Sequence, residues 1–366
     1  MPWGSSPSWT PRLRAALFAM AWACTGGGSA HADEEPAAPP EHATPRAVFK
    51  GFGNVDFHAE DGKAAFSLGA IDLFLTSSLS EGVSVLAELN VEQRGTEAST
   101  VEIERFQIQY APSDRFRFVL GRIHTSLGYW NQTFHHGTWI QTTAERPLIY
   151  RFEDDGGALP VHEVGLMVAG DVGSGRSRLE YALSVSNGRG ALPTDVQTIG
   201  DVDGLNALNL WLGFRPGFLR DLMVGGVVRR DRIPAVPDLD RTERLKERVL
   251  GGYAAYRTVR TEILGEYLDI SHESEASPGP KFVTKGAYLQ LSRAFRRVRP
   301  YYRFDWQDSD PDDPFYRSDQ PSLNSHTIGL RFDPHPWVTL KVEGSAVDRH
   351  PGGHDTVGVF QVAFTF

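Results

Sequence analysis

The segment Val83–Glu92, VSVLAELNVE, alternates between apolar and polar side chains along its whole length. Apolar side chains occupy every odd-numbered position, and most even-numbered positions are polar, among them Glu88 and Asn90. Successive side chains of a β-strand point to opposite faces of its sheet. The segment is therefore predicted to be a strand with one apolar face and one largely polar face.

The same alternation recurs along most of the chain. It is present in residues 105–110, 116–120, 178–185, 208–215, 301–306 and 338–343, and the polar face is charged in most of them. A soluble β-sandwich also alternates, but its apolar faces meet in a core and its strands are typically short. The segments here approach the ~10 residues that a tilted transmembrane strand needs, and aromatic residues lie near their ends. Because a closed barrel satisfies its own backbone hydrogen bonds in hydrocarbon, the pattern predicts an all-β, transmembrane antiparallel barrel over residues 47–366.

The connections between these segments fall into two groups. Short turns are expected at residues 78–82, 112–115, 172–176, 216–219, 257–260, 296–299 and 333–337. Variable, mostly polar connections are expected at residues 60–63, 94–100, 124–160, 188–203, 231–247, 272–282, 308–323 and 348–355. These links predict about sixteen strands, with short turns on one side and longer loops on the other, as in an outer-membrane barrel. An even strand number places both termini on the short-turn, periplasmic side.

The last strand supports this interpretation. Phe360, Val362, Phe364 and the terminal Phe366 alternate with smaller or polar residues. Outer-membrane barrels of Gram-negative bacteria commonly end on such an aromatic strand. The resemblance implies that Phe364 and Phe366 form a C-terminal signal recognised by the barrel insertion machinery.

Residues 1–32 are predicted to be a signal peptide. Arg12 and Arg14 form its positive region, and Ala15–Cys24 form an apolar region that is too short to span a bilayer. The small-x-small sequence that ends at Ala32 is a cleavage site. Residues 33–46 are rich in Pro, Ala and Glu, and are predicted to be a disordered periplasmic tail.

Cleavage after Ala32 removes the only cysteine, Cys24, and leaves 35 of the 37 basic residues with all 46 acidic ones. Acylation of Cys24 is the alternative, although Ala21 stands where the leucine of a lipoprotein signal would be expected. The acidic balance argues against nucleic acid as a partner. No cofactor is expected, and no later segment is apolar for long enough to predict a transmembrane helix.

A long segment without periodicity interrupts the strands at residues 124–160. Connections of this length in a compact domain are usually functional lids or binding loops. Its aromatic residues supply bulk, and its charged residues have both signs. A barrel of about sixteen strands is wide enough for an aqueous channel, and a loop folded into it would set the narrowest cross-section. The candidate constriction residues are Glu145, Arg146, Arg151, Glu153, Asp154 and Asp155, and the candidate lumen-wall charges are Glu88, Arg105, Arg117, Arg303 and Lys341.

The region from Gly121 to Gly165 resembles the phosphate-selective (O and P type) porin family. The similarity lies in the glycine-rich strand end Gly121–Gly128, in Glu145-Arg146-Pro147, and in the glycines that precede and begin the next strand. In that family this region is a third external loop folded into the channel. Ser126 stands where a proline would be expected, and the basic residues of those pores are not matched to positions here. The resemblance therefore implies a porin with a folded-in loop but not phosphate selectivity.

These observations favour an outer-membrane porin for the passive diffusion of small polar or ionic solutes. Its expected partners are outer-membrane lipid and lipopolysaccharide, the insertion machinery and the small solutes, with a homotrimer by analogy alone. Two alternatives stay open. One is a barrel hydrolase with a rim site at His135, His136, Asp154 and Asp155, and the other is a non-conducting structural or adhesion barrel.

The histidines His124, His135, His136 and His162 could also bind a metal ion, but their spacing matches no recognised ligand pattern. Adjacent histidines on an extended segment point in opposite directions, which also weakens the hydrolase alternative. No metal site is predicted.

Overall fold

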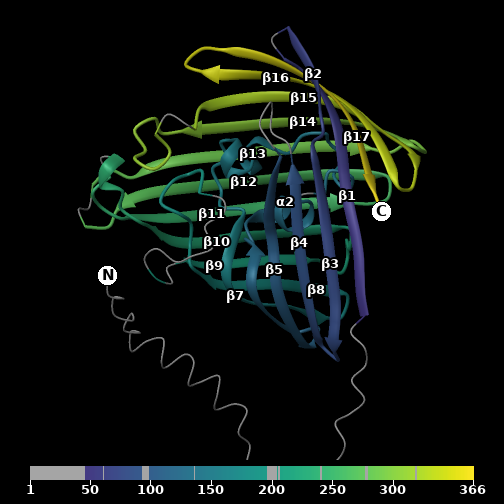
Figure 1. Cartoon of the computed structure of the whole chain (residues 1–366), viewed down its shortest axis with the longest axis horizontal. Helices are drawn as coiled ribbons and strands as arrows, with labels where there is room; N and C mark the ends of the chain where they lie inside the picture. Colours follow the sequence, from purple (N-terminus) through teal and green to yellow (C-terminus); the bar gives the residue numbers. More distant parts are fainter. Residues whose placement is uncertain are drawn as a thin grey trace, which may run out of the picture. The chain divides into compact units, whose positions relative to one another are not determined.

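The strands of the computed structural model form one closed antiparallel sheet (Figure 1). The structure describes residues 46–60, 62–92, 99–135, 137–195, 204, 207–239, 241–276, 279–317 and 320–366. The predicted signal peptide and residues 33–45 of the predicted tail lie outside the described residues. The strands are β1 (Arg46–Glu60), β2 (Lys63–Ser67), β3 (Ala70–Ser80), β4 (Val83–Glu92), β5 (Thr100–Ser113), β6 (Phe116–His124), β7 (His162–Ser174), β8 (Ser177–Ser186), β9 (Ala207–Arg215), β10 (Leu222–Ile233), β11 (Leu245–Arg257), β12 (Thr261–Ser274), β13 (Phe282–Arg293), β14 (Val298–Ser309), β15 (Ser322–His335), β16 (Val338–His350) and β17 (His354–Thr365).

Strands β2 and β3 are two halves of one interrupted strand. Both pair with β1, β2 with residues 56–60 and β3 with residues 46–53. At the break, the Asn54 side chain accepts a hydrogen bond from the Ala70 N–H at 3.2 Å, in place of a ladder bond. The barrel therefore has sixteen strands, and this prediction is confirmed. Every predicted connection falls between two strands, although the first and last of the variable group are short turns.

The barrel closes where β17 pairs with β1. The register runs from Phe52 opposite Thr365 to Glu60 opposite Val357, and the backbones of Gly51 and Phe366 exchange two hydrogen bonds of 3.0 Å. A Cβ at Gly51 would collide with the Phe366 ring, and one at Gly53 would collide with the Phe364 ring. Aromatic rings that cover strand glycines help to fix strand register. The two terminal phenylalanines are thus part of the closing seam.

The two faces of the sheet have the predicted polarity. Exposed outward side chains are apolar in strand after strand, including Leu89, Phe106, Leu120, Leu183, Leu210, Val228, Leu291, Ile328, Val342 and Phe360. Inward positions carry buried polar groups, including Asp72, Glu88, Glu163, Asn209, Arg229, Glu266, Arg303, Thr339 and Lys341. Exposed aromatic side chains lie at or beside the short turns, as in an interfacial girdle, and include Tyr110, Phe116, Phe214, Phe218, Phe295, Phe332, Trp337 and Phe366.

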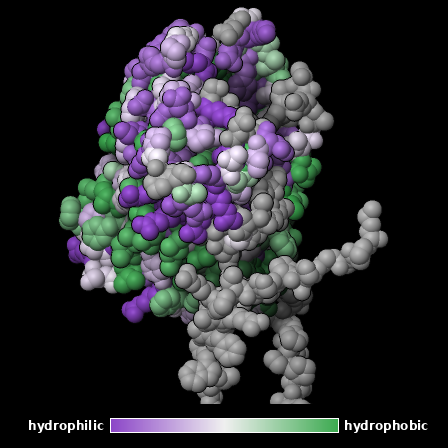
Figure 2. Space-filling view, turned by 90° about the vertical axis from the view of Figure 1, so that its left-hand side faces the viewer, coloured by the Kyte–Doolittle hydropathy of each residue, from purple (hydrophilic) through white to green (hydrophobic). Residues whose placement is uncertain are grey.

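Figure 2 shows the side of the barrel where the connections after β10 and β14 lie. Hydrophilic side chains gather over the middle of this view, and hydrophobic side chains lie along its margins. None of the described helices is long and apolar enough to cross a membrane. The helical elements of the described residues are α2 (Gly128–Thr133) and the 3-10 turns η1 (Leu148–Tyr150), η2 (Glu153–Asp155) and η3 (Pro237–Leu239).

Candidate functional site

The residues between β6 and β7, which we call the inner segment (residues 125–161), contact the inward faces of strands across the barrel. The segment begins and ends at one point, because His124 pairs with His162 and the Thr125 N–H donates to the Val161 carbonyl at 3.0 Å. It contains α2, η1 and η2. The segment contains no described strand, and it has short helical turns that the sequence pattern did not predict.

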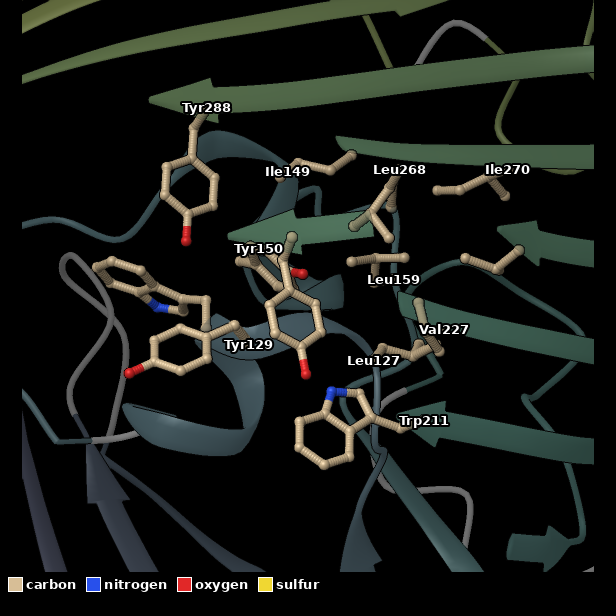
Figure 3. Close-up of a cluster of buried hydrophobic side chains, with 14 of the residues drawn as sticks. Leu127, Tyr129, Ile149, Tyr150, Leu159, Trp211, Val227, Leu268, Ile270 and Tyr288 are labelled. Atoms are coloured by element: carbon tan, nitrogen blue, oxygen red, sulfur yellow. The ribbon is translucent and has the colours of Figure 1, made fainter. Parts of the chain in front are cut away.

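An apolar cluster holds the segment against one side of the barrel wall (Figure 3). Leu127, Tyr129, Trp130, Phe134, Ile149, Tyr150 and Leu159 from the segment pack with wall residues that include Trp211, Val227, Leu268, Ile270 and Tyr288. The Trp130 side chain is completely buried, and its ring lies 5.8 Å from that of Tyr288 in an edge-to-face arrangement. Burial of each large apolar side chain contributes about 1.5–3 kcal/mol. The segment is therefore a packed part of the barrel.

Glu266 on β12 is the centre of the polar contacts to the segment. Its carboxylate accepts hydrogen bonds from the N–H groups of Tyr129 and Trp130, at 2.6 and 2.8 Å, in the first turn of α2. The hydroxyls of Tyr150 and Tyr288 donate to it at 2.8 and 2.6 Å. A helix start leaves N–H groups without intrahelical partners, and a carboxylate satisfies them well. Gly128 fits here because any Cβ would collide with Tyr150 and Glu266.

Carboxylates on two further strands accept hydrogen bonds from the segment backbone. Asp305 on β14 accepts the Leu148 N–H at 3.0 Å, and Glu343 on β16 accepts the Ala144 N–H at 2.8 Å. The Tyr301 hydroxyl also donates to Glu343, at 2.9 Å. The wall thus supplies acceptors at several points along the segment.

Cations on the same wall bind the carbonyl groups of the segment. Arg303 donates to the carbonyls of Glu145 and Arg146, at 2.7 and 3.1 Å. Lys341 donates to the Thr143 carbonyl at 2.8 Å and also to the Thr138 carbonyl. Because buried backbone groups require partners, these charges stabilise one path of the chain through the barrel.

All five candidate lumen-wall charges lie on the inner side of the barrel, but their surroundings differ. Arg303 and Lys341 are buried beneath the segment, as described above. Glu88 is buried and forms an ion pair with the partly exposed Arg105. Arg117 is exposed and lines a cavity. The sequence placed these charges inside but gave no sign that two of them bind backbone.

Two cavities adjoin the segment. One, of about 740 Å³, is lined by Glu145, Arg146, Arg151 and Asp155 together with residues of β1 and β2 that include Asp56 and His58. The other, of about 600 Å³, is lined by Tyr129, Gln132 and Thr133 from the segment and by Arg117, Asp171, Arg178, Glu180, Arg215 and Arg257 near the short turns. We call them the 740 Å³ cavity and the 600 Å³ cavity.

Four of the six candidate constriction residues therefore line one cavity. Arg146 donates to the His135 carbonyl at 2.9 Å, and its guanidinium lies 3.6 Å from the centre of the Phe152 ring. Burial lowers the pKa of Arg146 to about 10, so it stays charged at neutral pH. Glu153 lies apart from them, buried, and accepts the Val161 N–H at 2.9 Å. The side chain of Asp154 lies outside the described residues.

The buried side chain of Glu153 leads to a prediction about pH. We use docking for the packing of the inner segment against the barrel wall, and docking should depend on the pH. Burial raises its pKa to about 7, well above the ~4.3 of a solvated glutamate. The docked segment therefore holds a proton that the undocked segment releases between these values. Docking is expected to weaken as the pH rises through this window, by at most about 4 kcal/mol, and to stay constant above it.

Protease cleavage within residues 137–158 at pH 5 and pH 8 measures this dependence. Wild-type protein should be cleaved faster at the higher pH. Glu153→Gln keeps the acceptor for the Val161 N–H without the titration, and should lose the difference after correction for the pH dependence of the protease. Equal pH profiles for the two proteins would contradict the prediction.

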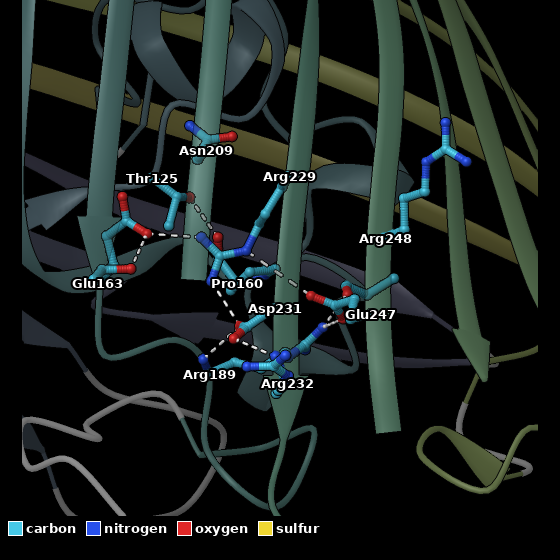
Figure 4. Close-up of polar contacts among 12 residues, drawn as sticks. Thr125, Pro160, Glu163, Arg189, Asn209, Arg229, Asp231, Arg232, Glu247 and Arg248 are labelled. Carbon is cyan, nitrogen blue, oxygen red and sulfur yellow. Dashed lines mark hydrogen bonds and ion pairs between the residues drawn. The ribbon is translucent and has the colours of Figure 1, made fainter. Parts of the chain in front are cut away.

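A second group of buried charges, which the sequence interpretation missed, lies beside the end of the segment (Figure 4). Arg229 on β10 is fully buried and donates to Glu163 and Asp231 at 2.7 and 2.8 Å. Arg189 donates to Glu247 at 2.7 Å and to the Ala158 carbonyl at 3.1 Å. The sequence signal was weak, because each of these charges occupies an ordinary inward position of its strand or connection.

Two residues of the hydrolase alternative, His135 and Asp155, line the 740 Å³ cavity. The Nε2 atom of His135, however, lies 2.9 Å from the Nε2 atom of His162. His136 lies outside the described residues. The described geometry thus brings His135 to other histidines.

A closed sixteen-strand barrel with an apolar outside and a polar inside is a transmembrane β-barrel. No protein-family model matches the sequence, and no curated protein matches it. Solved structures with this fold include the outer membrane channel DcaP of Acinetobacter baumannii, with a TM-score of 0.62 and 11% identity over 88% of this chain and 98% of that one. The anion-selective porin from Comamonas acidovorans has a TM-score of 0.62 and 10% identity, over 88% of this chain and 100% of that one.

OmpF of Salmonella typhi, in complex with daunomycin, has a TM-score of 0.61 and 10% identity, over 87% of this chain and 97% of that one. At these identities the likeness establishes the fold. The chain thus has the barrel fold of Gram-negative outer-membrane porins.

Proposed function

We propose that this protein is a porin that allows passive diffusion of small polar or ionic solutes, and that the inner segment constricts its channel. The observation that carries the proposal is the position of the segment. Its backbone is hydrogen-bonded to carboxylates of the wall, and different residues of the segment line the 600 Å³ cavity and the 740 Å³ cavity. In known channels, the narrowest cross-section and the charges around it set permeation.

The charges around the 740 Å³ cavity are the proposed filter. Arg146 and Arg151 face it together with Glu145 and Asp155, so the filter has charges of both signs. The 600 Å³ cavity is lined by four arginines and two acidic residues, some of them paired, as Arg178 is with Asp171. A solute that passes both cavities would thus meet a mixed set of charges at the 740 Å³ cavity and an excess of arginines at the 600 Å³ cavity.

Single-channel recording in planar bilayers tests the proposal. Purified, refolded protein is expected to give discrete conductance steps. If correctly folded barrels give none, the porin proposal fails and a structural or adhesion role is favoured.

Arg146 and Arg151 provide a test of the filter. Replacing both with Gln removes two positive charges from the 740 Å³ cavity, so the ratio of cation to anion permeability should rise on the order of two- to five-fold. The reversal potential under a salt gradient measures the ratio. Arg232→Gln is the matched control, because Arg232 is paired with Glu275 and exposed, and does not line either cavity. An equal shift in the control would contradict a filter at this cavity.

The closer relationship to phosphate-selective porins is also a proposal. It is supported by the glycine-rich strand end before the segment and by the Glu145-Arg146-Pro147 sequence within it.

Assembly into a homotrimer is proposed by analogy with a solved trimer form of the outer membrane protein OmpT of Vibrio cholerae, and the mass of the detergent-solubilised protein tests it. Cleavage after Ala32 is tested by sequencing the mature N-terminus.

A further inference from the structure

Three histidines and one glutamate meet where the inner segment joins the barrel. His124 is the last residue of β6 and His162 the first of β7, and they are cross-strand partners. His135 follows α2 within the segment, and Glu104 is the extra residue of a bulge in β5, between partners of Glu88 and Leu89. Four separate parts of the chain thus contribute one side chain each.

The donor atoms of these side chains converge. His135 Nε2 lies 2.9 Å from His162 Nε2, and Glu104 Oε2 lies 2.5 Å from His162 Nε2 and 4.0 Å from His135 Nε2. One nitrogen from each of the three histidines lies within 4.8 Å of the others. Ligand atoms around a tetrahedral zinc ion are separated by about 3.3 Å, given bond lengths of about 2.0–2.1 Å. The observed separations span this value.

The hydrogen bonds behind His135 orient it as a ligand. Asn131 Oδ1 lies 2.8 Å from His135 Nδ1 and can only accept a hydrogen bond from it, so the neutral imidazole carries its lone pair on Nε2. The orientation of the Asn131 amide is set on its other side, because its Nδ2 donates to the Thr125 carbonyl at 2.9 Å. Metal-binding histidines usually donate their second N–H to an oxygen in this way.

The site is shielded from water. Side-chain exposure is 6% for His135, 4% for His162, 2% for Glu104 and 13% for His124. His124 is the ligand that must move most, because its ring stacks on His135 with centroids 3.4 Å apart and its Nε2 lies 3.6 Å from Glu88. Rotation of this ring would turn a nitrogen toward the other three donors.

We propose that His124, His135, His162 and Glu104 bind a divalent transition-metal ion of the zinc class. Three imidazole nitrogens and one carboxylate oxygen form a donor set that suits Zn²⁺, and not the oxygen-only sets that Ca²⁺ and Mg²⁺ prefer. The ion joins both ends of the inner segment to α2 and to β5. It therefore fixes the segment at its base, whichever solutes the barrel conducts.

Isothermal titration of the chelator-treated, folded full-length barrel in detergent with Zn²⁺ tests the proposal. One ion per chain is expected to bind. His162→Ala should weaken binding at least about 100-fold, and Asn131→Ala, which removes only the hydrogen bond to His135, about 10-fold or more. Circular dichroism confirms that each variant is folded.

His354→Gln is the matched control, because His354 is an exposed histidine paired with Asp348 in the last turn region. It should bind Zn²⁺ as the wild type does. The proposal is overturned if the folded wild type binds no Zn²⁺, or if folded His162→Ala binds it as tightly as the wild type does. If His162→Ala does not fold, His135→Gln replaces it, with the same expected loss.

Discussion

Replacing residues 129–158 with a short Gly-Ser linker is expected to raise the single-channel conductance several-fold. The segment fills the space between the 740 Å³ cavity and the 600 Å³ cavity, and the narrowest cross-section limits conduction. The barrel should still form, because its strand pairing closes through β1 and β17 without the segment. Current steps in planar bilayers at fixed salt measure the effect.

Removal of the segment would expose the apolar side chains of Leu264 and Leu268 to water. The linker variant therefore carries Leu264→Ser and Leu268→Thr, and the same two substitutions in the full-length chain are the matched control. The control keeps the segment but loses two of the apolar contacts that hold it, so its conductance should lie between those of the wild type and the linker variant. If the linker variant conducts no more than this control, the segment does not form the constriction.

Glu266→Ala is expected to release the segment from the wall. Four buried donors lose their shared acceptor, and each unsatisfied buried donor costs about 1–3 kcal/mol, part of which water entry recovers. We expect docking to weaken by about 4 kcal/mol. Protease cleavage within residues 137–158, followed against urea concentration, measures the change.

Glu180→Ala is the control for this variant. Glu180 also lines the barrel interior, but its ion pair with Arg215 is partly exposed, and such pairs contribute at most about 1 kcal/mol. Equal cleavage of the two variants would show that Glu266 does not anchor the segment.

The barrel could be predicted from the sequence because one rule governs most strands. Lipid outside and polar groups inside impose a two-residue period, and Leu89 beside Glu88 and Asn90 follows it, as does Val342 beside Lys341 and Glu343. The connections could be predicted from the places where the two-residue alternation stops. These features depend only on neighbours in the sequence.

The way the segment docks could not be predicted, because it depends on distant pairs. On β12, Leu264 and Leu268 face inward where polar residues were expected, since they pack against the segment more than a hundred residues earlier in the chain. Glu266 between them was the available signal, as a carboxylate at an inward position with an apolar inward residue on either side. The alternation of apolar and polar residues is weakest where the inward face of a strand packs against the inner segment, because both faces of the strand are then apolar.

The histidine site shows the same limit. His124 and His162 are far apart in sequence and adjacent only because β6 pairs with β7, so no local spacing marks them. His135 joins them through the fold of α2. The sequence raised these three histidines as possible ligands, but only the pairing of strands brings them together and adds Glu104.

The contact between Phe366 and Gly51 means that the barrel cannot close without residue 366. The Thr365 hydroxyl bonds the Gly51 carbonyl across 314 positions of sequence, so no early portion emerging from a ribosome holds a complete ring. Such long-range closure slows folding and leaves unpaired strand edges exposed in the meantime. Residues 365 and 366 must therefore be synthesised before the barrel can close, and until then the polypeptide needs protection from aggregation.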